Sequence, residues 1–166
     1  MSLDSLRARD VMRTDFITAS PDTPVLEVFE ALLRHESHSV LIVNQTRRLL
    51  GIVSERDVLS LLMVSEPLTA GLLATVLETR ETIFEYLRQR IKSRSETAAD
   101  IMMAPVVTVR SEDGLDRIVA LMALKGLRQI PVAQDGRPLG TVSRSEVVAA
   151  IARLRLTPTR RAPRSS

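Results

Sequence analysis

Short apolar runs alternate with amphipathic segments along the first half of the chain. Residues 16–19 (FITA) are typical of a short strand, because they favour extended backbone. Apolar residues then recur at helical spacing over residues 25–33, which predicts a helix with one apolar face. Residues 39–43 (SVLIV) and 49–53 (LLGIV) are apolar runs of strand length on either side of a polar turn, so we expect an antiparallel hairpin. A second helix begins in the segment SERDVLSLLM.

The second half of the chain shows the same succession of patterns. We expect a short strand over residues 106–109 (VVTV) and a helix with an apolar stripe of Leu115, Ile118, Val119 and Met122. An apolar hairpin should follow, and then another helix from about Ser143. Its two strands are expected in the segments QIPVA and PLGTV, joined by a turn at QDG.

Four residues carry signals for the ends and edges of these elements. Thr23 is the predicted N-cap of the first helix, with Pro24 in its first turn, where the fixed φ of proline is tolerated. Gly126 is placed to end the helix of the second half in the left-handed conformation. Pro131 falls inside a predicted strand and favours an edge or a bulge there.

The two halves are copies of one unit. Residues 8–12 (ARDVM) align with residues 98–102 (AADIM) at a shift of 90, and after one deletion Gly51 aligns with Gly140 and Ser54 with Ser143. Each copy has the order β-α-β-β-α and is too small to bury its helices and sheet alone. The predicted fold is therefore α+β, with two repeats that pack on each other. The expected divisions are a first repeat at 7–63, a helical linker at 64–96, a second repeat at 97–156 and a disordered basic tail at 157–166.

The linker is longer than the ~4–6 residues of an ordinary connection, so it should carry structure of its own. Two interpretations remain open, namely an amphipathic helix docked on the repeats, or a contact with a second copy or a partner. Heptad spacing is followed by Ala70, Leu73, Leu77, Phe84, Leu87 and Ile91.

Composition narrows the function classes. The chain has no Cys, which excludes disulfides and thiolate chemistry, and aromatics are only 2%, so stacking platforms for single-stranded nucleic acid are nearly absent. No apolar run approaches the ~18 residues that span a bilayer, and we expect a cytoplasmic protein that contacts no membrane. The net charge is +3. Five Arg and no acid lie between residues 153 and 164, which indicates a solvated tail or, alternatively, a polyanion-binding patch.

Two turns from strand to helix carry a Ser followed three residues later by an acid. We call residues 54–57 (SERD) the first turn and residues 143–146 (SRSE) the second turn. Ser-x-x-acid is the pattern of a capping box, in which the hydroxyl and the carboxylate satisfy unpaired amides of the helix end. A carboxylate there is also suited to the vicinal hydroxyls of a ribose. Both interpretations stay open for Asp57 and for Glu146.

These repeats, with SPDTPV after the first short strand, GLRQIPV before the second hairpin, and the two turns, resemble the CBS domain family, named for cystathionine β-synthase. The resemblance covers both copies. It implies a tandem pair forming one pseudo-two-fold module, an adenosyl ligand bound between the halves, and regulation of an attached or partner protein. The implied ligand is an adenine nucleotide or S-adenosylmethionine, with energy sensing as a possible role and no required cofactor.

The resemblance also implies site residues. Asp57 matches the family's ribose-binding acid, whereas Glu146 is longer by one methylene, and Thr23 matches a position near the ribose and base. His38 and Arg128 match a phosphate-facing position, although His38 fits a surface histidine equally well. The predicted first site comprises Thr18, Thr23, Ser37, His38, Ser39, Ser54, Arg56 and Asp57, and the second comprises Thr108, Leu127, Arg128, Gln129, Ser143, Arg144 and Glu146. Arg56 and Arg144 are either donors to phosphate or helix-surface charges.

Neither a catalytic set nor a metal site emerges from the sequence. His35 and His38 are the only histidines, and as a metal pair they lack nearby ligands. We therefore expect no enzyme. The leading hypothesis is a stand-alone regulatory module that binds an adenosyl ligand and signals to an effector protein. It is expected to form a homodimer through apolar helix faces, such as those of residues 25–33 and 115–124. The alternatives are an interaction module with vestigial nucleotide sites and, third, a nucleic-acid binder acting through the Arg-rich tail.

Overall fold

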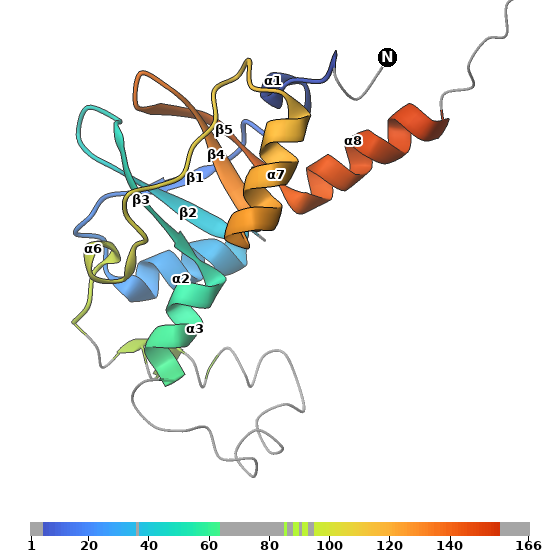
Figure 1. The fold of residues 1–166 in the computed structure, drawn as a ribbon. Coiled ribbons are helices and arrows are strands. Elements are labelled where there is room, and N and C mark those ends of the chain that lie inside the picture. The colour runs from blue at the N-terminus through green and yellow to red at the C-terminus, as the bar shows by residue number, and fades with distance from the viewer. Residues whose placement is uncertain are drawn as a thin grey trace, which may run out of the picture. The chain divides into compact units, whose positions relative to one another are not determined.

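The computed structural model describes residues 5–35, 37–63, 85, 88–89, 91–92 and 95–156, and these belong to two compact units (Figure 1). Unit 2 is continuous in sequence, Asp15–Val106, whereas unit 1 joins Met1–Thr14 to Val107–Ser166. Each unit contains helices packed on a small sheet. The predicted α+β class and the two repeats are thus confirmed.

Unit 2 is built on a three-stranded sheet of order β1-β2-β3. β1 pairs with β2 in parallel, and β2 pairs with β3 antiparallel, which confirms the predicted hairpin. Figure 1 shows α2 lying across the sheet and α3 leaving the end of β3. The elements are β1 (Ile17–Ala19), α2 (Val25–Arg34), β2 (Ser39–Val43), β3 (Leu49–Ser54), α3 (Glu55–Met63) and α6 (Ala98–Ile101).

The apolar face of α2 is confirmed, because Val25, Val28, Phe29 and Leu32 are buried. The predicted N-cap is wrong. Pro24 holds the N-cap position, without a side-chain capping bond, and Thr23 lies one residue earlier. The hydroxyl of Thr23 is already engaged in the preceding turn, where it accepts the N–H of Ser20 at 3.1 Å.

Unit 1 is built on the antiparallel hairpin of β4 and β5. α7 packs against β4, while α8 packs against β5 and contacts both α1 and α7. Gly126 ends α7 at φ 66°, as predicted for a left-handed C-cap. The elements are α1 (Ala8–Val11), α7 (Leu115–Lys125), β4 (Gln129–Gln134), β5 (Arg137–Ser143) and α8 (Arg144–Leu156).

The strand predicted over residues 106–109 is not formed and is replaced by a single bridge between Val109 and Val132. The N–H of Val109 donates to Pro131 O at 3.1 Å, and the N–H of Ala133 donates to Val109 O at 2.9 Å. To extend this parallel pairing toward residue 106, residue 131 would have to donate its backbone N–H, and proline has none. Leu41 holds the equivalent place in the first copy, where β1 reaches three residues. The predicted irregularity in β4 is confirmed by a register shift between Val132 and Ala133.

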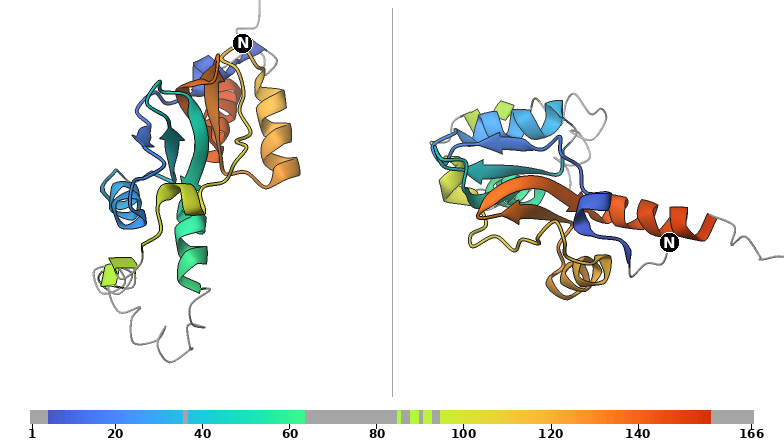
Figure 2. Two further views of the ribbon diagram at one scale, coloured as in Figure 1. Left: turned by 90° about the vertical axis from the view of Figure 1, so that its left-hand side faces the viewer. Right: turned by 90° about the horizontal axis from the view of Figure 1, so that it is seen from above.

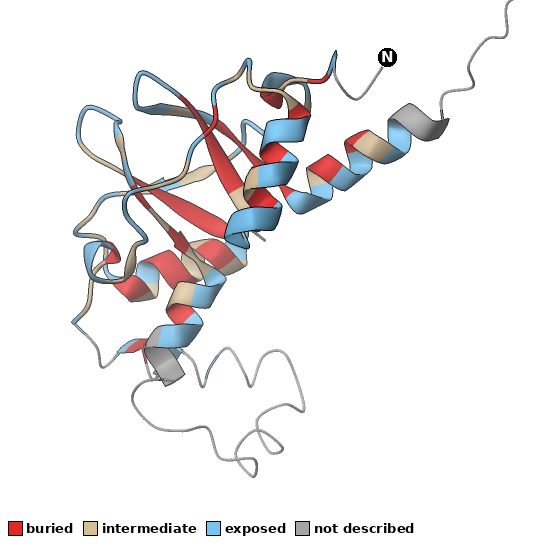
Figure 3. Ribbon diagram, viewed as in Figure 1, coloured by how far each residue is buried: buried red, intermediate tan, exposed pale blue. Residues whose placement is uncertain are grey.

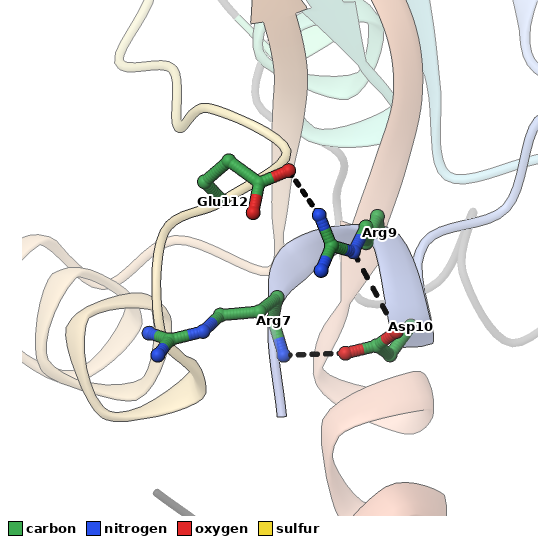
Figure 4. Close-up of polar contacts among 4 residues, drawn as sticks. All are labelled: Arg7, Arg9, Asp10 and Glu112. Carbon is green, nitrogen blue, oxygen red and sulfur yellow. Dashed lines mark hydrogen bonds and ion pairs between the residues drawn. The ribbon is translucent and has the colours of Figure 1, made fainter. Parts of the chain in front are cut away.

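Each short leading helix packs with the other copy's hairpin unit. Residues 5–14, which contain α1 and are called the arm, belong to unit 1, where Arg13 forms a β-bridge with Thr141. α6 belongs to unit 2, where Met103, which follows it, forms a β-bridge with Ile52. Figure 2 shows the blue arm beside the orange and red elements of unit 1. In Figure 4, Arg9 of the arm forms an ion pair with Glu112 on the loop before α7. The boundaries of the sequence repeats therefore differ from those of the compact units, because each unit contains the leading helix of the other repeat.

Each unit has its own hydrophobic core, and Figure 3 shows buried residues in red on the helices and strands of both. In unit 2 the core includes Ile91 of the linker, which is 1% exposed. Arg88 of the linker forms an ion pair with Glu30 on α2 at 2.9 Å. These linker residues dock on their own chain, in line with the first of the two interpretations. The other heptad positions, Ala70, Leu73, Leu77, Phe84 and Leu87, and the tail at 157–166 lie outside the described residues.

Candidate functional site

The first turn joins β3 to α3, and its acid caps the helix. Asp57 Oδ2 accepts the backbone N–H of Ser54 at 2.7 Å and the hydroxyl of Ser54 at 2.6 Å. Both residues are half-buried. Within the described part of the chain no hydrogen bond reaches Asp57 Oδ1. That oxygen remains an acceptor for a further donor.

The second turn joins β5 to α8 and forms a reciprocal capping box. Glu146 Oε2 accepts the N–H of Ser143 at 2.7 Å, and the hydroxyl of Ser143 accepts the N–H of Glu146 at 3.4 Å. The hydroxyl of Ser54, by contrast, turns toward the carboxylate of Asp57. The longer Glu thus leaves its serine hydroxyl to the helix amide, whereas the shorter Asp takes both donors of its serine.

This acid cap alone does not identify a ligand site. The carboxylate of Asp100 accepts the N–H of Thr97 at 2.7 Å and its hydroxyl at 2.9 Å, although the sequence predicts no ligand there. These bonds hold the pKa of Asp100 below its ordinary value of 3.8, the backbone bond being the larger cause. The first and second turns differ from the Asp100 cap in the segment that lies next to each of them.

In unit 2 the residues predicted to face adenine and phosphate lie beside the first turn. Ser39 pairs with Ser54 across the β2–β3 ladder, and the hydroxyl of Ser37 donates to Ser39 O at 2.9 Å. His38 Nδ1 lies 3.6 Å from Glu55 Oε2, and both side chains are more than half exposed. The strand pairing thus brings residues 37–39 and the first turn to one end of the hairpin.

The remaining predicted residues of the first copy are placed differently. Thr18 is exposed on β1, where it pairs with Leu41 of β2. β2 thus lies between Thr18 and β3, the strand that leads to the first turn. Thr23 belongs to the turn that begins at Ser20. Arg56 is exposed and forms no ion pair within the described ranges. Unit 2 by itself therefore assembles only part of the predicted first site.

In unit 1 the same arrangement recurs with different side chains. Gln129 pairs with Ser143 across the hairpin. The guanidinium Nε of Arg144 donates to Leu127 O at 2.9 Å, and its backbone N–H donates to Arg128 O at 3.0 Å. Residues 127–129 and the second turn are therefore joined by hydrogen bonds as well as by strand pairing.

Thr108 lines a cavity of about 370 Å³ in unit 1 together with Val109, Arg110, Asp113 and Arg117. Asp113 accepts the N–H of Arg110 at 2.8 Å and lies 3.6 Å from Arg117. Sequence reasoning missed Arg110, Asp113 and Arg117 as lining residues. The repeat contained the signal, because Asp113 aligns with Thr23 and makes the same bond to a backbone N–H three residues earlier.

Two searches restricted to the described residues were negative. No group of three or more His, Cys, Asp or Glu side chains there is placed to hold a metal ion. No helix in the described ranges has the length and apolar character needed to cross a bilayer.

Comparison with known proteins gives a consistent picture. A family model, the CBS domain, matches residues 8–64 and again residues 98–153. An uncharacterised protein of Methanopyrus kandleri is 28% identical over 145 residues, which are 87% of this chain and 62% of that protein. This chain therefore spans about three fifths of that relative's length.

Two solved structures share the fold. The Arabidopsis thaliana protein CBSX2, solved in complex with AMP, matches with a TM-score of 0.69 at 21% identity, over 91% of this chain and 99% of that chain. The CBS domain pair of protein MJ0100, solved with 5′-methylthioadenosine and S-adenosyl-L-methionine, matches with a TM-score of 0.65 at 17% identity, over 90% and 98%. At these identities the likeness establishes the fold alone.

Proposed function

Because the chain belongs to the CBS domain family, which both of its repeats match, we propose that it is a regulatory module that binds an adenosyl ligand. The observation that carries the proposal is the pairing, within each unit, of a Ser-x-x-acid turn with the segment before the opposing strand. Ser39 with Ser54, and Gln129 with Ser143, hold these two parts together. Each unit thus presents a carboxylate next to a cluster of polar and basic groups.

The chemistry of an adenosyl ligand fits these groups. The free oxygen of Asp57 can accept a ribose hydroxyl, and a charged acceptor forms stronger hydrogen bonds than a neutral one. Adenosine is the part shared by AMP in the CBSX2 complex and by the two ligands of the MJ0100 complex. Those complexes support the choice of ligand class for this chain, with Asp57 as the ribose-binding group of the first turn and Glu146 as that of the second.

The proposed output is regulation of an effector protein in the cytoplasm, without catalysis. A homodimer is part of the proposal. Leu124 on α7 is 85% exposed and Val148 on the neighbouring α8 is 65% exposed. Phe29, which aligns with Val119, is buried in unit 2, whereas Val119 is 40% exposed in unit 1. These exposed apolar side chains of α7 and α8 are suited to contact with a second copy of the chain.

The alternative is an interaction module whose ligand sites are vestigial. One observation favours it, since Asp57 and Glu146 already cap helices through the same kind of bond that Asp100 makes. The exposed apolar side chains of α7 and α8 would then contact the partner protein.

Isothermal titration calorimetry separates the two proposals. The whole chain is titrated with AMP, ADP, ATP, S-adenosylmethionine and NAD, and heat saturating at a defined stoichiometry with at least one of the adenosyl compounds is expected. Asp57→Asn should weaken that binding, while Asp100→Asn, which alters a cap of the same kind on α6, should leave it unchanged. A flat response of the wild type to all five compounds would contradict ligand binding and favour the interaction module.

A further inference from the structure

The two turns differ in charge at two pairs of equivalent positions. Aligning the copies places Glu55 on Arg144 and His38 on Arg128. Both turns precede a helix, so the dipole of the helix end is common to them and cannot distinguish their ligands. The side chains around the turns are what distinguish them.

At the first turn, an acid stands close to the predicted phosphate-facing position. Glu55 Oε2 lies 3.6 Å from His38 Nδ1, and the N–H of Glu55 donates to His38 O at 3.4 Å. The carboxylate of Asp57 lies two residues further along. A chain of phosphates placed here would meet two carboxylates against the single guanidinium of Arg56. The one cationic partner of Glu55 is a histidine that is charged only when protonated.

At the second turn, Arg144 takes the place of Glu55 and Arg128 takes the place of His38. The bond from Arg144 Nε to Leu127 O holds the base of the guanidinium and leaves its terminal amino groups available as donors. Arg128 is tied to the same place through its carbonyl, which accepts the N–H of Arg144. Neither guanidinium forms an ion pair with a carboxylate of the described residues. Two unpaired guanidinium groups beside one turn favour a ligand with several negative charges.

We propose that the second turn selects a nucleoside polyphosphate, through Arg128 and Arg144, and that the first turn selects an adenosyl ligand without a phosphate chain. The inference rests on the proposed function and deepens it, because it assigns a ligand class to each turn. The protein would thus report on two kinds of adenosyl compound at once, one polyanionic and one neutral or cationic.

The test is a calorimetric titration of the whole chain with adenosine, ATP and 5′-methylthioadenosine. The wild type is expected to bind one ATP, more tightly than adenosine, and to bind 5′-methylthioadenosine without competition from ATP. Arg144→Glu should weaken ATP by about ten- to a hundredfold, because a charged hydrogen bond is lost and a repulsion is introduced, and should change 5′-methylthioadenosine by less than about twofold. Arg144→Gln removes the charge with a smaller change of shape and should weaken ATP in the same direction.

Arg137→Glu is the matched control, since Arg137 is exposed at the far end of the same hairpin, where it pairs with Gln134. The reciprocal variant Glu55→Arg should raise the ATP stoichiometry from one to two. Circular dichroism and thermal melting identify any variant that fails to fold. The ATP preference of the wild type should also shrink as salt is raised.

The possible failures are distinct. If the wild type binds none of the three compounds, the proposed function itself is wrong. If it binds adenosine and ATP equally, or if Arg144→Glu and Arg137→Glu weaken ATP alike, ligand binding stands and the assignment by charge is overturned. ATP displacing 5′-methylthioadenosine from a single site would overturn it as well.

Discussion

At the scale of single residues, Asp57 holds two donors of one serine on a single oxygen, at 2.7 and 2.6 Å. Glu146 holds only the N–H of Ser143, whose hydroxyl bonds back to the helix. Both carboxylates accept the serine N–H at 2.7 Å, and only that of Asp57 also accepts the serine hydroxyl. We propose that this difference of one methylene makes the two copies unequal as ribose sites.

Replacing Asp57 with Asn should separate capping from ligand binding. The amide is a weaker acceptor for the two donors of Ser54, so the free energy of unfolding should fall by about 0.5–1 kcal/mol. Binding of the adenosyl ligand should weaken by about 2 kcal/mol, because a charged acceptor is lost. Urea unfolding and calorimetry measure the two effects independently. Unchanged affinity in Asp57→Asn would reduce Asp57 to a helix cap.

Glu146→Asp is the complementary change in the second copy. The shorter carboxylate should draw the hydroxyl of Ser143 away from the helix amide and adopt the geometry of the first turn. We expect tighter binding of nucleotide at that turn, by up to about tenfold. Calorimetry on the variant measures it, and weaker binding would show that the length of Glu146 is required.

Asp100 allows a prediction about pH. Its folded pKa is depressed by the bonds from Thr97, so the stability that it contributes is present above the ordinary value of 3.8 and is lost as the pH falls through the lower folded pKa. Asp100→Asn should therefore reduce stability at neutral pH and make no difference in strong acid. Melting temperatures of both proteins across that range measure the convergence, and a constant difference would contradict it.

At the scale of elements, hydrophobic periodicity was sufficient for the helices and hairpins, because burial of Val25, Val28 and Leu32 on one face decides where α2 lies. It was insufficient where one backbone group decides the outcome. Residues 106–109 have the composition of a strand, but a strand needs a donor from its neighbour, and Pro131 has none. Thr23 has the chemistry of an N-cap, but its hydroxyl already takes part in the preceding turn.

The candidate site was predicted to a similar depth. Local spacing indicated the two turns, and strand register then brought residues 37–39 and 127–129 beside them. The cavity next to Thr108 was missed, since its lining depends on how the loop before α7 folds back on itself through Asp113. Residue types alone do not specify that loop.

Gly140 and Gly51 are equivalent in the repeat but differ in what approaches them. A Cβ at Gly140 would lie 2.5 Å from the backbone oxygen of Arg13, whereas a Cβ at Gly51 would meet the side chain of Met102. A flexible thioether can move aside and a paired backbone cannot. We expect Gly140→Ala to cost about 1–3 kcal/mol of unfolding free energy and Gly51→Ala distinctly less. Denaturant titrations decide this, and equal losses would mean that the arm adjusts.

At the scale of the whole molecule, the exposed apolar side chains of Leu124 on α7 and Val148 on α8 predict self-association. Light scattering at micromolar concentration should give twice the mass of one chain. The double substitution Leu124→Glu and Val148→Glu should halve that mass, because charge is placed in an apolar contact. Leu139→Glu, which changes a less exposed residue on β5, serves as the control. A monomeric wild type would exclude the dimer.

The exchange of the two leading helices has a consequence for the order in which the chain completes its structure during synthesis. Unit 2 is one continuous stretch, Asp15–Val106, so all of its residues have been synthesised before the second hairpin is made. The arm around Ala8 emerges first, yet its partner Thr141 is among the last described residues to follow. Newly made chains should therefore hold a closed unit 2 beside an exposed arm. Cutting the gene between the repeats would separate each hairpin from the short helix that packs with it. The first half would keep α1, which unit 1 requires, and the second half would keep α6, which unit 2 requires.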